Sequence, residues 1–258
     1  IMSADTYANP YPPERFPYQT VSTVSATQAR ISVGIDENDS SDFLPMGPED
    51  LVAYCARVSN PSNQSNRETG PKLVKYLMKN KHWSPLEMVD VTLEINTTRD
   101  VARQILRHRS FSFQEFSQRY ADASQLGLIT TKEARLQDTT NRQNSHVNGI
   151  DPVLEEWWRD IQDVLAKSAT DIYEMALKHG MAKEVARAIL PEGMTMSRVL
   201  MKGSLRSWLH YVELRTANGT QAEHMDVAEK CRVQLEQVCQ TFFAKPEVPN
   251  LEDVRPGA

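Results

Sequence analysis

The sequence predicts an α+β fold in which helices flank a largely antiparallel, twisted sheet. Residues 88–98, MVDVTLEINTT, alternate between apolar residues (Val89, Val91, Leu93 and Ile95) and polar ones, which is typical of a strand with one buried face. Several segments with the three-to-four residue spacing of amphipathic helices precede and follow this strand. We find no internal repeat, so a single mixed domain is the simplest interpretation.

The first half of the chain contains four further predicted elements. Residues 29–35, ARISVGI, alternate like a strand, and Pro48 opens a predicted helix over 48–59. The segment 72–81 is amphipathic with a basic outer face, which indicates a second helix. Helical spacing returns over 99–109, directly after the alternating strand.

The second half begins with residues 121–148, which are polar and weakly patterned and are expected to form a long loop. Asp151 and Pro152 are suited to the N-cap and first turn of a helix that ends at Gly180. Four elements follow, namely a short helix over 181–190, a strand over 197–203, a helix over 204–215 capped by Ser204, and a last helix over 221–243.

The two ends of the chain are predicted to be flexible tails. Residues 1–29 contain Pro10, Pro12, Pro13 and Pro17, followed by a small, polar stretch. Residues 245–258 are also rich in proline. The sequence therefore predicts one domain over 30–244.

Composition excludes several classes of function. The chain has 258 residues, 40% of them hydrophobic, and a net charge of -5, which argues against a protein that coats nucleic acid or an anionic membrane. No apolar run approaches the roughly 20 residues that span a bilayer, and no secretory signal is recognised, so we expect a cytoplasmic protein. The histidines and the three cysteines show no metal-binding spacing, and no metal is expected.

The segment 107–120, RHRSFSFQEFSQRY, carries the strongest signal for chemistry. Arg107, His108, Arg109 and Arg119 lie within fourteen residues, with Glu115 as their acidic counterpart. Guanidinium groups bind phosphates and carboxylates through paired, charge-assisted hydrogen bonds. The alternative is a solvated basic helix end, but three phenylalanines between the polar residues favour a pocket wall.

These residues also resemble a known family. Arg107-His108-Arg109, seven residues and then Ser117 reproduce the RHR-x7-S signature of the flavin-dependent thymidylate synthases. The resemblance extends to four other segments over roughly residues 48–240, namely ARVS (56–59), KHWSPLE (81–87), EVARAILP (184–191) and SLRSWLHYVELR (204–215).

The resemblance implies two groups of binding residues and two catalytic ones. The residues expected to bind FAD are Ser59, Ser84, Arg107, His108, Arg109, Glu115, Ser204, Leu205, Arg206 and His210. The residues expected to surround dUMP are Gln104, Arg107, Glu115, Phe116, Ser117, Gln118, Arg119, Arg187 and Arg215. Arg215 would favour ionisation of the uracil ring nitrogen, and His82 would lie near the flavin ring. His210 stands where many relatives carry asparagine, and both side chains donate hydrogen bonds.

The implied reaction is reductive methylation of dUMP to dTMP, with methylenetetrahydrofolate as one-carbon donor, FAD as hydride carrier and NADPH as reductant. The resemblance also implies a homotetramer with shared active sites, to which the helix over 152–179 would supply a packing surface. No cysteine lies in the cationic setting of an activated thiolate. A flavin-dependent NADPH oxidoreductase without methyl transfer and an RNA-binding module are the alternatives.

Several of these residues also have simpler, purely structural interpretations. Ser204 is suited to plain helix capping, and Arg215 to a salt bridge with Glu213 or Glu223. Ser117 would act as a nucleophile only with a general base within reach, so we expect it to contact phosphate or uracil. His82 alone is weak evidence of a site.

Overall fold

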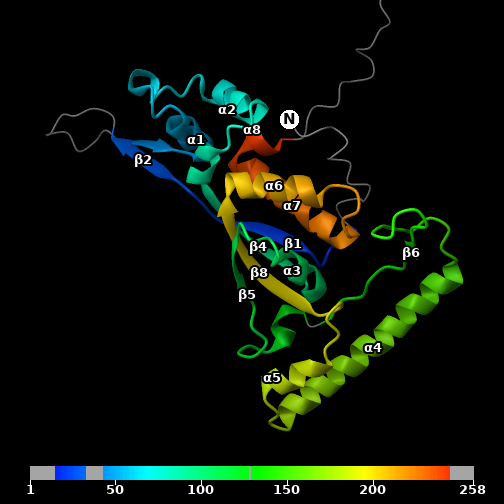
Figure 1. Cartoon of the computed structure of the whole chain (residues 1–258). Coiled ribbons are helices and arrows are strands. Elements are labelled where there is room, and N and C mark those ends of the chain that lie inside the picture. Colours follow the sequence, from blue (N-terminus) through cyan, green and yellow to red (C-terminus); the bar gives the residue numbers. More distant parts are fainter. Residues whose placement is uncertain (1–14, 33–42, 128, 245–258) are drawn as a thin grey trace, which may run out of the picture.

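A computed structural model describes residues 15–32, 43–127 and 129–244. At its centre is a four-stranded sheet with the strand order β1-β4-β8-β5, in which every neighbouring pair is antiparallel (Figure 1). In this order the strands span Thr20–Ala26, Asp90–Thr98, Met196–Ser204 and Ser112–Glu115. The predicted α+β fold with an antiparallel sheet is confirmed.

Strand β4 buries one face, as its alternating sequence predicts. Val91, Leu93 and Ile95 are fully buried, whereas the residues between them are partly exposed. Leu93 lies opposite Met201 of β8, and Ile95 lies opposite Val199. Since side chains paired across antiparallel strands share a face, the two central strands bury one continuous apolar surface.

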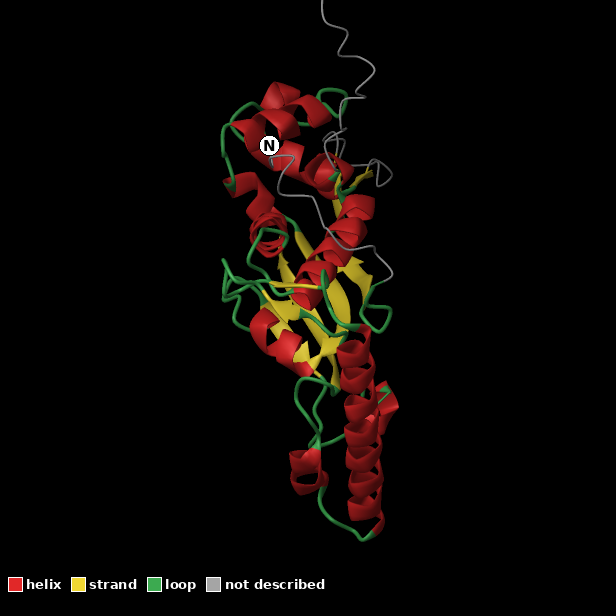
Figure 2. Cartoon of the chain, turned by 90° about the vertical axis from the view of Figure 1, so that its right-hand side faces the viewer, coloured by secondary structure: helices red, strands yellow, loops and turns green. Residues whose placement is uncertain are grey.

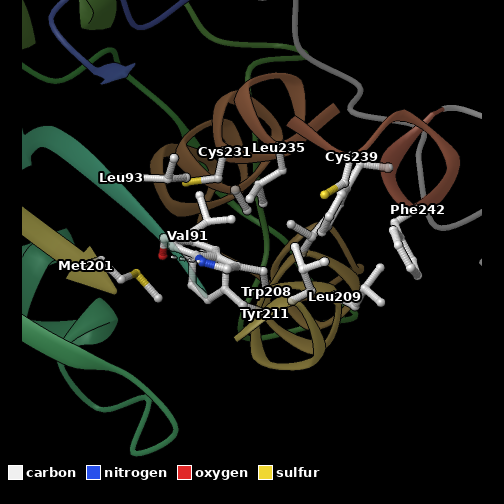
Figure 3. Packing of buried hydrophobic residues seen from close by; sticks show 14 of the residues in the cluster. Val91, Leu93, Met201, Trp208, Leu209, Tyr211, Cys231, Leu235, Cys239 and Phe242 are labelled. Carbon is white, nitrogen blue, oxygen red and sulfur yellow. Dashed lines mark hydrogen bonds between the residues drawn. The ribbon is translucent and has the colours of Figure 1, made fainter. Parts of the chain in front are cut away.

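Two helices cover this surface, α6 (Leu205–Arg215) and α7 (Ala222–Val238) (Figure 1). The indole nitrogen Nε1 of Trp208 donates a hydrogen bond to the backbone oxygen of Val91 at 3.0 Å, which anchors α6 to β4. Figure 3 shows Trp208 and Tyr211 of α6 packed with Cys231 and Leu235 of α7. The start of α6 at Ser204 is as predicted.

A second helical layer lies at one end of the sheet. It consists of α1 (Pro48–Ala56), α2 (Gly70–Lys79), the 3-10 turn η3 (Ser84–Met88) and α8 (Gln240–Phe243), which contact one another. The helices predicted over 48–59 and 72–81 are therefore confirmed.

The remaining elements connect these layers. They are β2 (Ala29–Ser32), β3 (Phe43–Met46), η2 (Pro61–Asn63), α3 (Arg99–Ile105), η4 (Ala123–Leu126), β6 (Leu136–Gln137), β7 (Ser145–His146), α5 (Lys183–Ala186) and η5 (Arg187–Ile189). Strands β2 and β3 form one hairpin and strands β6 and β7 form another, each separate from the central sheet.

Helix α4 (Pro152–Lys178) extends away from the rest of the molecule (Figure 2). Its first free N–H groups are capped by Asp151, whose side chain accepts a hydrogen bond from the backbone N–H of Val153 at 2.9 Å. Along its 27 residues, Gln162, Ala169 and Tyr173 are the buried ones. Within the described ranges, no helix combines the length and the apolar composition needed to cross a bilayer.

The expected N-terminal tail over 1–29 is wrong in its second half, because residues 20–26 form the edge strand β1. Phe16 and Gln19 just before it are buried. The strand escaped recognition because its sequence, TVSTVSA, is mostly polar. An edge strand of an antiparallel sheet can expose most of its side chains and still be held by main-chain hydrogen bonds to β4. Residues 1–14 and the expected tail over 245–258 lie outside the described residues.

Other element boundaries also differ from the prediction. The helix expected over 99–109 ends at Ile105, and residues 112–115, for which no element was predicted, form the strand β5. The expected loop over 121–148 contains η4 and the hairpin of β6 and β7. The last helix is interrupted at Cys239, whose backbone has the extended φ of −145°.

Candidate functional site

Arg215 and His108 form the first part of the candidate site. The Nε of Arg215, near the end of α6, donates a hydrogen bond to the Nε2 of His108 at 2.9 Å. Since Nε2 accepts, the proton of the neutral ring is on Nδ1. Burial lowers the pKa of His108 to about 4, and the charges of Arg215, His210 and Arg107 act in the same direction. His108 is therefore a neutral N–H donor near pH 7.

The alternative salt bridge of Arg215 to Glu213 or Glu223 does not occur among the ion pairs of the described residues. Glu223 pairs with Arg135 instead, at 2.6 Å. The guanidinium of Arg215 is half-buried and keeps further N–H donors for a ligand.

Arg107 and Arg109 flank His108 and are exposed. Neither pairs with an acidic side chain in the part of the chain that the structure describes. By contrast, Arg103, one turn earlier in α3, donates to Glu192 at 2.8 Å. The two arginines of the RHR segment thus retain their full capacity to bind an anion.

A cavity of about 460 Å³ lies between η3 and α6. The residues that line it are Trp83, Glu87, Ser110, Arg206, Ser207, Leu209, His210 and Glu213. Arg206 and His210, both predicted to bind FAD, therefore face the same space. Ser84, from the same prediction, is the residue after Trp83 and the first of η3.

Ser204 has two roles at the edge of this cavity. Its Oγ caps α6 by accepting a hydrogen bond from the N–H of Ser207 at 3.3 Å, as the capping interpretation predicts. The same hydroxyl donates to Oε2 of Glu87 at 2.6 Å, and Arg206 bonds the other oxygen of that carboxylate at 2.8 Å. Glu87 thus connects η3 to the first turn of α6.

Three other predicted residues are placed less favourably for direct side-chain contact. The Leu205 side chain is fully buried, and its N–H donates to the backbone oxygen of Val89 at 2.9 Å. Ser59 is exposed after the end of α1. His82 is exposed, with its ring edge against Tyr76 at a centroid distance of 5.9 Å.

A second cluster surrounds Glu115 at the end of β5. Ser197 donates to Oε1 of Glu115 at 2.9 Å, and Arg99 approaches the same oxygen at 3.6 Å. Burial lowers the pKa of Arg99, the carboxylates of Glu115 and Glu192 oppose this effect, and the cations Arg103 and Arg187 lower the pKa further. Arg187 is thus close enough to Arg99 to act on it electrostatically.

The residues after Glu115 continue along the same end of the molecule. Phe116 is half-buried and Ser117 is exposed. Gln118 is 3% exposed, and its Nε2 is one of the buried atoms for which the described residues offer no hydrogen-bond partner. Such a donor costs about 1–3 kcal/mol unless a ligand or another chain satisfies it. Arg119 is exposed and pairs with Glu184 at 3.3 Å.

The helices next to the cavity and next to Arg187 lie in different parts of the molecule. Figure 1 places α5, directly before Arg187, near the lower tip of the molecule, and α6, which carries Arg206 and His210, in its upper half. The structure therefore brings Arg215 together with His108, and Arg206 together with His210, but it does not bring all the predicted site residues into one pocket.

Comparison with known proteins gives the family. A family model described as thymidylate synthase complementing protein matches residues 44–240. The chain belongs to this family. A protein of Paramecium bursaria Chlorella virus 1, described as a probable flavin-dependent thymidylate synthase, is 50% identical over 187 residues, which cover 71% of this chain and 83% of the relative. The flavin-dependent thymidylate synthase of Synechocystis sp. is 48% identical over 191 residues, which cover 74% and 86%.

The fold agrees with this assignment to the thymidylate synthase complementing protein family. The crystal structure of a UMP/dUMP methylase from Streptomyces cacaoi, bound with 5-Br dUMP, matches with a TM-score of 0.65. The identity is 22%, and the match covers 87% of this chain and 93% of the other. The resemblance based on the RHR-x7-S signature is thus confirmed, and the protein is an enzyme of this family.

Sequence reasoning missed two residues of the Arg215–His108 group. Tyr211 lies under the His108 ring at a centroid distance of 4.9 Å, and His224 of α7 lies 6.3 Å from the same ring. Both are fully buried. The sequence could have indicated His224, because a histidine on the inward face of a helix requires polar partners. The sequence does not identify those partners.

Phe111 and Phe113 are two of the three phenylalanines expected to form a pocket wall. Both pack against the hydrophobic core and are partly buried. Phe111 meets Trp208 edge-on at 4.8 Å between ring centroids, and it covers Gly203 so closely that a Cβ there would overlap its ring. These phenylalanines therefore support the RHR segment from the core side.

Proposed function

We propose that the protein converts dUMP to dTMP, with FAD as hydride carrier, methylenetetrahydrofolate as one-carbon donor and NADPH as reductant. The observation that carries the proposal is the RHR segment. Arg107, Arg109 and Arg215 are cations without an acidic partner among the described residues. The first two flank His108 in sequence and the third is bonded to it, within a chain of the thymidylate synthase complementing protein family. The names of the relatives support the flavin and the product.

The residues present suit a flavin dinucleotide. Arg107 and Arg109 offer planar donor forks to a diphosphate. Arg206 and His210 line the cavity beside the start of α6, where an anion is favoured by the helix dipole. The unpartnered amide of Gln118 also calls for a ligand or a second chain. Bound FAD would supply the hydride chemistry, while the protein binds and orients the reactants.

Arg215 is the residue that we assign to the uracil ring. A guanidinium is a cation that can stabilise negative charge on a ring nitrogen. The hydrogen bond to neutral His108 fixes its direction without neutralising its charge. Arg119, Arg187 and Ser117 are assigned to the nucleotide, with the phosphate as the partner of the arginines.

Nucleophilic catalysis by the protein is disfavoured. Cys231 and Cys239 are fully buried, and burial raises the pKa of both thiols. Burial also raises the pKa of Cys55. Ser117 has no side-chain hydrogen bond to a general base among the described residues, and the accepting nitrogen of His108 is already bonded to Arg215. Methyl transfer without a covalent bond to the enzyme fits this arrangement.

We also propose a homotetramer in which several copies build each site. Helix α4 exposes a series of large apolar side chains, and a soluble monomer rarely exposes so large an apolar surface. The residues are Val153, Leu154, Trp157, Trp158, Ile161, Val164, Leu165, Ile172 and Met175. The second argument is that α5, directly before Arg187, and α6, which carries Arg206, lie in different parts of one chain (Figure 1), and a neighbouring copy would bring the two arginines to one nucleotide pair.

Shared sites can be tested by mixing two inactive variants. Arg187→Ala and Arg215→Ala should each abolish dTMP formation. When the two are unfolded and refolded together, a fraction of the mixed assemblies contains an intact site, so part of the activity should return. Refolding each variant alone is the control. If the mixture stays as inactive as the separate variants, the sites are not built from several copies.

The function itself is tested by a product assay. Purified protein with FAD, dUMP, methylenetetrahydrofolate and NADPH should form dTMP, measured by chromatography, and omission of dUMP or of the folate should abolish the product. Oxidation of NADPH with no dTMP in the complete mixture would support the oxidoreductase alternative. A salt-sensitive gel shift with unspecific RNA, in protein that takes up no flavin, would support the RNA-binding alternative.

A further inference from the structure

A chain of hydrogen bonds links α6 to α7 beneath the Arg215–His108 pair. The hydroxyl of Tyr211 lies 3.2 Å from Nε2 of His224, and Nδ1 of His224 lies 3.2 Å from Oε1 of Gln104. Nε2 of Gln104 donates to Oε1 of Gln221 at 2.6 Å, and Nε2 of Gln221 donates to Oε2 of Glu223 at 2.9 Å. Four consecutive side-chain contacts thus connect a tyrosine to a carboxylate.

The carboxylate fixes the direction of every bond in this chain. Burial raises the pKa of Glu223, but Lys132 and Arg135 outweigh burial and the net pKa is lower than usual, so Glu223 is ionised and can only accept. Gln221 must then present its N–H to Glu223 and its oxygen to Gln104.

The same logic continues to the other end of the chain. Gln104 must donate to Gln221 and present its oxygen to His224, so Nδ1 of His224 carries the proton. Nε2 of His224 is left to accept from Tyr211, whose hydroxyl stays protonated because burial raises its pKa. Burial lowers the pKa of His224 to about 3, and the neutral ring that the bonds require is the stable form.

Gln104 is the member of the chain that lies nearest in sequence to the RHR segment. It is half-buried and stands near the end of α3, four residues before His108, whose ring is bonded to Arg215. Its amide uses one N–H and one lone pair in the chain and keeps one of each for a ligand. Without these bonds, the amide could rotate about its Cγ–Cδ bond, so that Oε1 and Nε2 exchange places. A nucleotide would then face an N–H donor at the position of the acceptor oxygen.

We propose that His224 is a positioning residue that locks the amide of Gln104 in one orientation for the nucleotide. The inference rests on the proposed function, in which Gln104 contacts dUMP. His224 itself is fully buried and acts through Gln104 without touching the substrate. Its lock works together with Glu223, which holds the opposite end of the chain.

Two substitutions at one position separate positioning from folding. His224→Asn keeps an N–H donor at the position of Nδ1, whereas His224→Leu removes both ring nitrogens at similar volume. We expect His224→Leu to raise the KM for dUMP about tenfold, the effect of one lost or misdirected neutral hydrogen bond, with kcat nearly unchanged. His224→Asn should restore a KM close to that of the wild type. Flavin absorbance and thermal melting check that both variants fold and hold FAD.

A variant at the far end of the chain gives a second, independent reading. Glu223→Gln removes the obligate acceptor, so both glutamines can reverse and the KM for dUMP should rise in the same way. The double variant His224→Leu, Glu223→Gln should raise the KM no further than the larger of the two single substitutions. Both substitutions remove the same constraint on the orientation of the Gln104 amide, so their effects should not add. Additive effects would contradict a shared lock.

The outcomes separate this inference from the proposed function. If the wild-type protein forms dTMP and folded His224→Leu protein keeps the wild-type KM for dUMP, the positioning role is overturned and the function stands. The positioning role is also overturned if His224→Asn is as impaired as His224→Leu. A wild-type protein that neither binds dUMP nor forms dTMP would overturn the proposed function and the inference together.

Discussion

Acidification should destabilise this protein because the half-buried His108 and the buried His224 resist protonation. Folding lowers the pKa of His108 to about 4 and that of His224 to about 3, mainly through burial, from an ordinary value near 6.5. Below pH 6.5 the unfolded chain therefore binds protons that the folded chain does not. The free energy of unfolding is therefore highest well above pH 6.5, where the histidines are neutral in both states, and it decreases as the pH falls toward 4.

The slope follows from proton linkage. Each histidine that is charged only in the unfolded state lowers the free energy of unfolding by about 1.4 kcal/mol per pH unit. His224, which is fully buried, accounts for roughly 1.6 kcal/mol between pH 6.5 and 5, and the half-buried His108 adds less because solvent screens it. This is a noticeable part of the roughly 5–15 kcal/mol that stabilises an ordinary domain.

Urea unfolding at fixed protein concentration, followed by tryptophan fluorescence at half-unit steps from pH 8 to 5, measures this slope. Trp208 is a suitable reporter because it is fully buried next to Tyr211. His224→Asn removes one titrating group, so its slope below pH 6 should be shallower by about 1.4 kcal/mol per unit. Between pH 7 and 8 the two slopes should coincide. Equal slopes below pH 6 would refute the reasoning.

Four further outcomes are expected. Arg215→Ala should abolish dTMP formation while the absorbance spectrum of bound flavin remains, and Ser117→Ala should weaken dUMP binding in a titration but leave some turnover. Gly203→Ala should lower the free energy of unfolding by about 1–3 kcal/mol in urea titrations, because the new Cβ overlaps Phe111. Ile161→Glu on the exposed face of α4 should reduce the assembly to smaller species in light scattering, since a charge in an apolar interface is costly.

The sequence predicts the local parts of this fold well. Alternation over 88–98 identifies β4, and Asp151 and Ser204 mark the starts of α4 and α6, because a strand period and a helix cap are properties of neighbouring residues. Strand β1 could not be recognised in this way. Its few inward side chains leave no clear pattern, and pairing with β4, some seventy residues later, decides its structure.

The candidate site shows the same division between local and long-range information. The RHR signature and the N-cap of α6 are continuous in sequence and could be recognised. The hydrogen bond between Gln104 and His224 joins residues 120 positions apart, and no spacing rule connects them. The distance between Arg187 and Arg206 is a property of the folded chain, and their meeting requires an assembly that one sequence does not display.

The most direct test of the central claim is a crystal structure with FAD and dUMP bound. We predict that Arg107 and Arg109 contact the flavin nucleotide, that Arg215 lies against the uracil ring beside His108, and that Arg187 of a neighbouring copy contacts the same dUMP. Nucleotides bound elsewhere, or Arg107 and Arg215 directed into solvent in a site with both ligands present, would contradict this claim.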